Sequence, residues 1–472
     1  MGTLVERSKA RLATPAEAAE RLRKSRTRIN EMALASWGVF NIAIVFVQMF
    51  MAPFGLQVGV NIGNLNKYFM FSLGAWIAVA MVRKVAPLRL PGAMVGLICV
   101  QLWFTVSSMV AQIELGRAHE VSAPDYSLVG FLLCFLQGSM LVSFFPHIRV
   151  WLKRVIVGLC VLSAFVAVLQ FLNFGPAIAL LNIMVGFGGE GGWSGQGSIR
   201  AMGIFPGVGL QVTYSLIAVG LIASALYSRK LLPIEIVLII VLTGMMFMAQ
   251  VRNALVMVAV VMVPLIVLFV KRHKQRAIPY IVAGVIALLL LVFSGSGRFD
   301  YMLSGDTSTL DYRYDVLWPQ ARTIFEQRPW FGIGVEPTFA GAPSFVRDRW
   351  TDGLLIDNGY LVALAFGGLP ALVFVVMSVL LGAFGALRLL VRRGAEPIER
   401  GFAIAACIVV LLFGYGMYFG NMFTNISIGM LYFIIAGVAL PSVRPGSIPT
   451  LVGVHPPESA VDRPLSLTST HE

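Results

Sequence analysis

The chain has 472 residues, of which 58% are hydrophobic and only 12% are charged. About a quarter of the residues in a typical soluble domain are charged, so this composition excludes a soluble globular protein. The net charge of +13 does not require a nucleic-acid partner, because the basic residues gather in loops between apolar runs, where anionic lipid is their counterpart.

The N-terminal segment, residues 1–32, is polar and basic and lacks the apolar core of a signal peptide. We expect it to be a cytoplasmic tail. Residues 15–28 within it have the composition of an amphipathic helix that lies near anionic lipid.

The rest of the chain is dominated by apolar runs of about 20 residues, the length that crosses a bilayer as a helix. They lack the alternating pattern of a membrane barrel. The expected architecture is therefore an all-α, polytopic integral membrane protein. We predict about twelve transmembrane helices at 33–53, 65–82, 93–112, 127–145, 155–175, 207–227, 232–249, 254–270, 278–294, 359–384, 401–418 and 421–440. Residues 250–253 could instead join two of these runs into one bent helix.

Basic residues orient this topology, because cytoplasmic loops are enriched in Lys and Arg. With the N-terminus inside, every inside loop is basic. The loop residues concerned are Arg83, Lys84, Arg89, Arg149, Lys153, Arg154, Arg229, Lys230, Lys271, Arg272, Lys274, Arg276, Arg388, Arg392, Arg393 and Arg400. We predict helices one to nine in 33–294, a long outer loop in 295–358, helices ten to twelve in 359–440, and a cytoplasmic C-terminal tail in 441–472.

Two predicted outer loops stand out. The first, 175–206, contains a glycine run without the Lys-Ser/Thr of a phosphate-binding loop, and we interpret it as a flexible lid or spacer. The second is long enough to indicate a function. Its stretch 311–328 is predicted to be helical and closed by Pro329. The residues that can share one helical face are Val316, Leu317, Ala321, Ile324 and Phe325.

The basic residues expected outside are almost all Arg, whose planar group binds phosphate in a bidentate fork. Two charges lie at membrane depth: Arg252 between two apolar runs, and Asp357 before the tenth span. Charges there are costly and tend to face a polar cavity. Each also has a simpler interpretation, since Arg252 could reach lipid phosphate and Asp357 could cap its helix.

No metal or cofactor site is predicted. The four cysteines lie inside apolar runs without metal-ligand spacing. The acidic side chains of the outer loop are expected to be solvated, with a divalent-metal site as the alternative. These are Asp300, Asp306, Asp311, Asp315, Asp348 and Asp352.

Four features in order form a recognisable pattern across residues 198–385. They are Arg200-Ala-Met-Gly-Ile-Phe-Pro206, the re-entry at Arg252, the stretch from Arg313 through Trp318 and Ala321 to Pro329-Trp-Phe-Gly-Ile-Gly334, and Asp357-Asn-Gly-Tyr-Leu361 followed by Gly367-Gly368. The pattern resembles the O-antigen ligase/polymerase superfamily of bacterial surface-glycan enzymes. Each motif is degenerate, and the match rests on their order and membrane placement.

This resemblance implies a membrane glycosyltransferase of the GT-C type in the bacterial inner membrane. It also implies a polyprenyl-pyrophosphate-linked glycan donor, used on the outer side. Ligases of the superfamily typically have His where this chain has Asp357. The resemblance therefore favours a polymerase of O-antigen or exopolysaccharide repeat units, with an O-antigen ligase acting on lipid A core as the alternative. A chain-length regulator or export machinery is a further expected partner.

By resemblance and placement, Asp357 is the candidate base, and Arg252 and Arg313 are the candidates that neutralise the diphosphate. The residues expected to bind substrate are Arg200, Arg322, Arg328, Tyr312, Trp318, Tyr360 and Asn358. A flippase or transporter of lipid-linked oligosaccharide is the alternative from another class. It predicts charges deep in several spans and an internal repeat, neither of which the sequence shows. Motifs of the shape, elongation and division polymerases are also absent.

Overall fold

The structure is a computed structural model, and it describes residues 30–47, 62–83, 90–114, 127–145, 147–185, 201–205, 207–249, 252–274, 278–279, 281–282, 285–286, 311, 313–334, 345–348, 351–355, 358–418 and 426–440. These residues form helices and one small hairpin. Seven of the described helices are long and apolar enough to cross a membrane, and shorter apolar helices accompany them. The predicted all-α, polytopic membrane fold is confirmed.

The described helices follow the predicted order. The first is Asn30–Val47. The next are α2 (Ile62–Arg83), α3 (Gly92–Glu114), α4 (Ser127–Phe144), α5 (Ile148–Phe171), α6 (Gly175–Val185), α7 (Val208–Ala223), α8 (Pro233–Met248) and α9 (Arg252–His273). After the long loop come α14 (Gly359–Leu390), α15 (Pro397–Gly414) and α16 (Ile426–Ala439). The ninth predicted span, 278–294, lies mostly outside the described residues.

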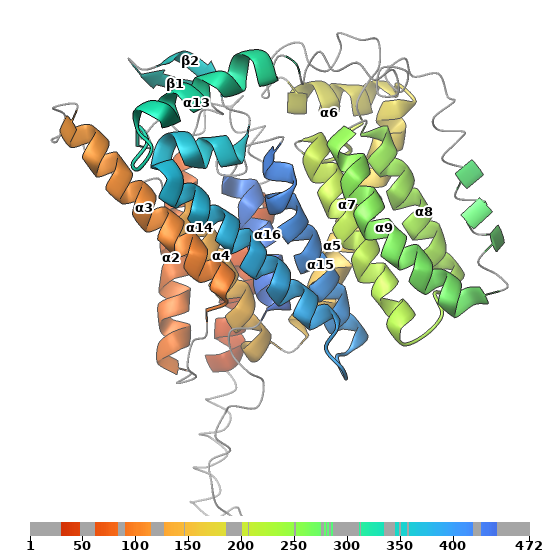
Figure 1. Cartoon of the computed structure of the whole chain (residues 1–472). Coiled ribbons are helices and arrows are strands. Elements are labelled where there is room, and N and C mark those ends of the chain that lie inside the picture. Colours follow the sequence, from red (N-terminus) through yellow and green to blue (C-terminus); the bar gives the residue numbers. More distant parts are fainter. Residues whose placement is uncertain are drawn as a thin grey trace, which may run out of the picture.

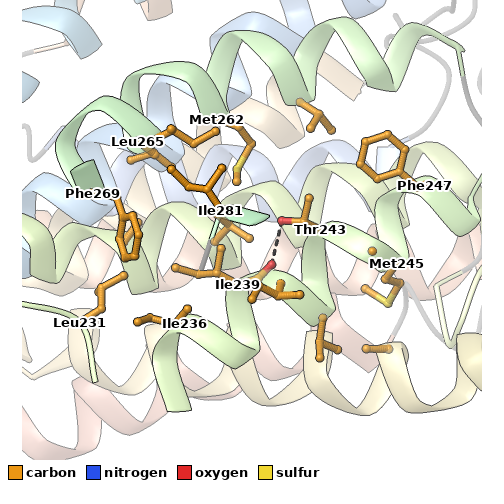
Figure 2. Close-up of a pocket in the computed structure, with 18 of the residues that line it drawn as sticks. Leu231, Ile236, Ile239, Thr243, Met245, Phe247, Met262, Leu265, Phe269 and Ile281 are labelled. Atoms are coloured by element: carbon orange, nitrogen blue, oxygen red, sulfur yellow. Dashed lines mark hydrogen bonds between the residues drawn. The ribbon is translucent and has the colours of Figure 1, made fainter. Parts of the chain in front are cut away.

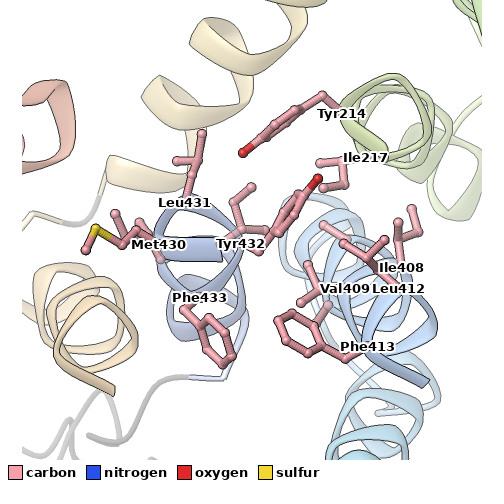
Figure 3. Close-up of a cluster of buried hydrophobic side chains, with 14 of the residues drawn as sticks. Tyr214, Ile217, Ile408, Val409, Leu412, Phe413, Met430, Leu431, Tyr432 and Phe433 are labelled. Atoms are coloured by element: carbon pink, nitrogen blue, oxygen red, sulfur yellow. The ribbon is translucent and has the colours of Figure 1, made fainter. Parts of the chain in front are cut away.

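The centre of the bundle is α7, which is almost completely buried. It packs against α5, α8, α9 and α15, while α4 lies along α16 and α3 along α14 (Figure 1). In the core, the ring of Tyr214 on α7 stacks on Tyr432 of α16 with 5.2 Å between centroids (Figure 3). Phe413 of α15 closes the same cluster against Phe433.

One end of the bundle collects the basic residues that the sequence assigns to inside loops. Arg149 pairs with Glu399 at 3.0 Å, and Arg229 pairs with Glu235 at 2.7 Å. Arg272 donates to the backbone oxygens of Leu226 and Tyr227. The first contact joins α5 to α15, and the other two join α8 and α9 to the turn after α7. These basic residues therefore lie at or next to helix ends.

The opposite end carries elements that the sequence did not resolve. The short helix α6 packs against α5 and lies crosswise to the long helices (Figure 1). At 11 residues it is apolar but too short to span. The glycine run interpreted as a lid or spacer lies outside the described residues. A hairpin, β1 (Phe345–Asp348) and β2 (Thr351–Leu355), pairs antiparallel within the long loop.

The helix start that differs most from its predicted position is that of α5. This helix begins at Ile148, so Lys153 and Arg154 lie in its first turns and not in a loop. Long basic side chains can reach the membrane surface from such positions, which hides the start from a hydropathy pattern.

The runs on either side of residues 250–253 are two helices, as predicted. Helix α8 ends at its cap Ala249, and α9 begins at Arg252.

Candidate functional site

The helix predicted in the long loop exists and lies at the end opposite the basic cluster. It consists of a π-helix, Arg313–Leu317, followed by α13, Trp318–Gln327. Ala321 and Ile324 are buried, as expected from the shared face, and α13 lies against α14. Single π-turns recur at functional sites, and this one contains Arg313.

Directly after α13, residues 329–334 dock into a break in α14. We call these residues the docking segment. Gly368 has φ 69° and ψ −165°, which interrupts the helical backbone, and Pro370 has no N–H to offer Phe366. Several main-chain groups of α14 are thereby left without helical partners. In hydrocarbon, each unsatisfied group would cost several kcal/mol.

The docking segment supplies the missing partners. Ile333 N–H donates to Ala365 O at 2.9 Å, and Gly334 N–H donates to Phe366 O at 3.0 Å. In return, Leu369 N–H donates to Pro329 O at 2.8 Å. The outer loop and the membrane helix are therefore joined by main-chain hydrogen bonds, like neighbouring strands.

Glycine makes this close approach possible. Gly332 and Gly368 both have positive φ, and a Cβ on either would collide with main-chain atoms across the junction. A Cβ on Gly334 would lie 2.9 Å from Cα of Ser108 in α3. The Gly-rich motif is thus explained by packing against two helices at once.

The C-terminal end of α15 contacts both the helix of the long loop and the start of α14. This end continues into a short 3-10 turn, Gly416–Tyr418. The hydroxyl groups of Tyr314 and Tyr418 share a hydrogen bond of 2.6 Å, and Trp318 contacts the Tyr418 ring edge-on at 5.1 Å between centroids. Arg313 directly precedes Tyr314.

The start of α14 reaches the same turn. A Cβ on Gly359 would lie 2.7 Å from Cε of Met417, and the Tyr360 hydroxyl donates to Gly414 O at 2.5 Å. Asn358 caps this helix, since its Oδ1 accepts from the N–H groups of Tyr360 and Leu361. The cap that the sequence also allowed for Asp357 is therefore provided by Asn358.

The remaining predicted site residues are described unevenly. Arg200, Tyr312 and Asp357 lie outside the described residues, and Arg252 is described only as the first residue of α9. Arg313 is half-buried. Arg322 is 79% exposed and pairs with Glu326, whereas Arg328 pairs with Glu114 at the end of α3. Arg328 therefore connects the end of α13 to α3, whereas Arg322 stays on the surface of α13.

The segment after Arg200 is also firmly held. Residues 201–205 are almost completely buried between α5 and α7. Gln170 of α5 accepts from Met202 N–H and Gly203 N–H at 3.0 and 2.9 Å, and it donates to Gly203 O at 2.9 Å. Ser163 accepts from Ile204 N–H at 3.0 Å. We call this arrangement the glutamine cradle.

A cavity of about 520 Å³ lies between α5, α7, α8 and α9 (Figure 2). Its walls are apolar, and the Thr243 hydroxyl among them donates to Ile239 O at 2.7 Å. The cavity offers space for hydrocarbon and no charged group. Within the part of the chain that the structure describes, no three His, Cys, Asp or Glu side chains are close enough to hold a metal ion.

Sequence reasoning missed four residues that organise this end. Tyr314 and Tyr418 join the loop to α15, Trp103 contacts the junction from α3, and Gln170 forms the cradle. A polar amide in the middle of the apolar run of α5 is a signal for Gln170. The aromatic residues carried no signal, because aromatic residues are common at membrane interfaces.

Comparison with known families supports the superfamily expected from the sequence. Residues 236–376 match the family model of the O-antigen ligases. This range contains most of α8, all of α9 and α13, the docking segment, and α14 as far as residue 376. None of the curated proteins compared with the chain matches it.

Proposed function

From the premise that the chain carries the core of the O-antigen ligase/polymerase superfamily, we propose that it is a membrane glycosyltransferase that polymerises repeat units. Its donor would be an oligosaccharide linked to polyprenyl pyrophosphate, and the acceptor another lipid-linked unit. The polymer would be an O-antigen or exopolysaccharide made on the outer side of the bacterial inner membrane.

One observation supports this proposal most strongly. The turn Gly416–Tyr418 contacts the neighbour of Arg313 through Tyr418 and the start of α14 through Met417. The candidate base Asp357 lies two residues before Gly359 in the sequence. Tyr314, the neighbour of Arg313, and Gly359, two residues after Asp357, therefore contact the same short turn. A cation and a carboxylate close to this turn would suit a site for a diphosphate ester.

The proposed reaction is a substitution at the anomeric carbon. The acceptor hydroxyl attacks this carbon as Asp357 takes its proton, and the bond to the diphosphate oxygen breaks. Polyprenyl pyrophosphate leaves with the electron pair. Arg313 and Arg252 would neutralise the growing negative charge without a metal ion, and Arg200 would support them.

Substrate contacts would come from the surrounding side chains. Arg322 is exposed on α13, where it pairs with Glu326, and could meet a glycan from the solvent side. Trp318 contacts the Tyr418 ring, and Tyr360 donates to Gly414 O near the end of α15. Tyr312, Arg328 and Asn358 complete the proposed set. Asn358 would act mainly by fixing the start of α14, because its oxygen caps that helix.

The test is a polymerisation assay with purified protein in nanodiscs and a lipid-linked repeat unit. We expect Asp357→Asn to lower kcat by about 100- to 10,000-fold, as for loss of a general base. Arg313→Lys should also be impaired, because a point charge cannot replace a bidentate fork. Arg392→Ala at the basic end is the control. Near-normal turnover of both Asp357→Asn and Arg313→Ala would contradict the assigned roles.

The acceptor distinguishes the two activities of the superfamily, because the matching family model is that of the ligases. A polymerase forms a ladder of products when the lipid-linked unit is both donor and acceptor. A ligase forms product only when lipid A core is added. Chelation by EDTA tests the proposed metal independence in the same assay, and a loss of turnover restored by a divalent cation would contradict it.

A further inference from the structure

The junction between the docking segment and α14 has one partner that belongs to neither. Trp103 of α3 donates its indole N–H to Gly367 O at 2.6 Å. The same ring stacks on Phe331 of the docking segment, with 5.3 Å between centroids and 12° between planes. Trp103 therefore contacts both sides of the junction from a third element.

Gly367 is the last residue before the break at Gly368. A positive-φ glycine without a side chain is a natural pivot, so the outer part of α14, Gly359–Gly367, could tilt there. Main-chain bonds from Ile333 and Gly334 hold Ala365 and Phe366. The carbonyl nearest the pivot is held by Trp103 instead, which ties the outer part of α14 to α3.

The other end of this outer part carries the proposed chemistry. It begins at the Asn358 cap, and Gly359 contacts the turn after α15 that Tyr314 also reaches. Tyr360 donates to Gly414 O just before that turn. A small rotation at Gly368 would move the cap relative to Arg313. Misplacement of a reacting group by about 1 Å can cost about 100-fold in rate.

We propose that Trp103 is a positioning residue that fixes the angle between the outer and inner parts of α14, and so sets the Asn358 cap relative to Arg313. The expected effect of Trp103 on the reaction rate rests on the proposed glycosyl transfer. Its expected effect on the angle within α14 does not. Trp103 itself touches no substrate in this scheme.

The key variant is Trp103→Phe, which keeps an aromatic ring against Phe331 and removes the indole donor. The matched control is Trp76→Phe. Trp76 also donates an indole N–H to a main-chain oxygen, Leu34 O at 2.8 Å, but it does so between the first helix and α2. Both variants lose one bond of the same kind. Trp76 is completely buried and Trp103 only half-buried, so the thermal stability of Trp76→Phe should fall at least as far as that of Trp103→Phe.

In the nanodisc assay we expect Trp103→Phe to lower kcat by about 10- to 100-fold with little change in KM for the donor. Trp76→Phe should stay within about twofold of the parent protein. Equal kcat values for the two variants would overturn the positioning role. If the parent protein itself fails to polymerise or ligate, the proposed function fails, and the geometric measurement below decides the inference alone.

The geometric measurement uses spin labels on both sides of the pivot, at Leu364→Cys and Leu380→Cys, in a background from which the four native cysteines have been replaced. Leu364 is half-buried and Leu380 is 58% exposed, so both positions accept a label. Trp103→Phe should broaden or shift the distance distribution, and Trp76→Phe should not. An unchanged distribution in Trp103→Phe overturns the proposal.

Discussion

Two segments without regular structure return toward the bundle at the same end, and they are stabilised in different ways. Residues 201–205 are held by side chains, chiefly Gln170 and Ser163 on intact helices. The docking segment is held by main-chain groups that α14 exposes at its break. In both cases every bond described satisfies a backbone group that the membrane would leave without water.

The difference lies in what each arrangement demands of the sequence. A side-chain cradle depends on one or two polar residues, and its helices are unaffected by what they hold. The broken helix α14 depends on glycine at several positions. It also depends on the docking segment, because each of the two supplies hydrogen-bond partners for main-chain groups of the other. The second arrangement therefore couples the outer loop to α14, whereas the first only fixes a segment in place.

The largest effect is expected from Gly368→Ala. Its Cβ would collide with main-chain atoms of Pro329 and Trp330 at a backbone conformation that alanine rarely adopts. Main-chain atoms cannot rotate away, so we expect a loss of about 3–5 kcal/mol in stability, measured by thermal unfolding in detergent. The control is Gly244→Ala in α8, where a Cβ meets nothing within 4 Å. A Gly368→Ala protein as stable as the control would mean that the break does not need its close packing.

A smaller effect is expected at the cradle. Gln170→Leu leaves two N–H groups and one carbonyl of residues 202–203 without their partner, at a cost of about 3 kcal/mol. Gln137→Leu in α4 is the matched variant. Gln137 is equally buried but donates only to Gly38 O at 2.7 Å, and its own oxygen has no hydrogen-bond partner within the described residues. Equal losses for the two variants would show that the cradle adds nothing beyond one bond.

The smallest effect is expected for the ion pair between Arg328, the residue just before the docking segment, and Glu114 at the end of α3. Glu114 is about half exposed, so solvent screens the attraction. A double-mutant cycle with Arg328→Gln and Glu114→Gln should give a coupling of about 0.5 kcal/mol in unfolding stability. A coupling several times larger would make this pair, and not the main-chain bonds, the principal connection.

The spans and the loop helix could be predicted because they depend on patterns of many residues. The lengths of the apolar runs predicted the membrane helices. The spacing of Ala321 and Ile324, together with Pro329, predicted the helix in the long loop. The broken helix was not predicted, although Gly367-Gly368-Leu-Pro370 carries the signal. Its long apolar run hid the break, because glycine and proline are tolerated in membrane helices when neighbours satisfy the freed groups.

The candidate site was only partly predictable for the same reason. The motif glycines contribute to the family resemblance, but their physical role depends on contacts with Ala365, Phe366 and Ser108, which are distant in sequence. The turn Gly416–Tyr418 carried no signal, because its importance lies in which two segments touch it. Contacts of this kind arise from tertiary packing and produce no periodic pattern in the sequence.

The break also determines depth. From Leu369 to Leu390, α14 measures roughly 33 Å at 1.5 Å per residue, which matches a hydrocarbon core of about 30 Å. A membrane centred on that length would place Gly359–Gly367 level with the phosphate groups of the lipids. In the reaction proposed above, the carrier lipid would present its diphosphate at that level. Its polyprenyl chain would stay dissolved in the leaflet, and its sugars would extend into water.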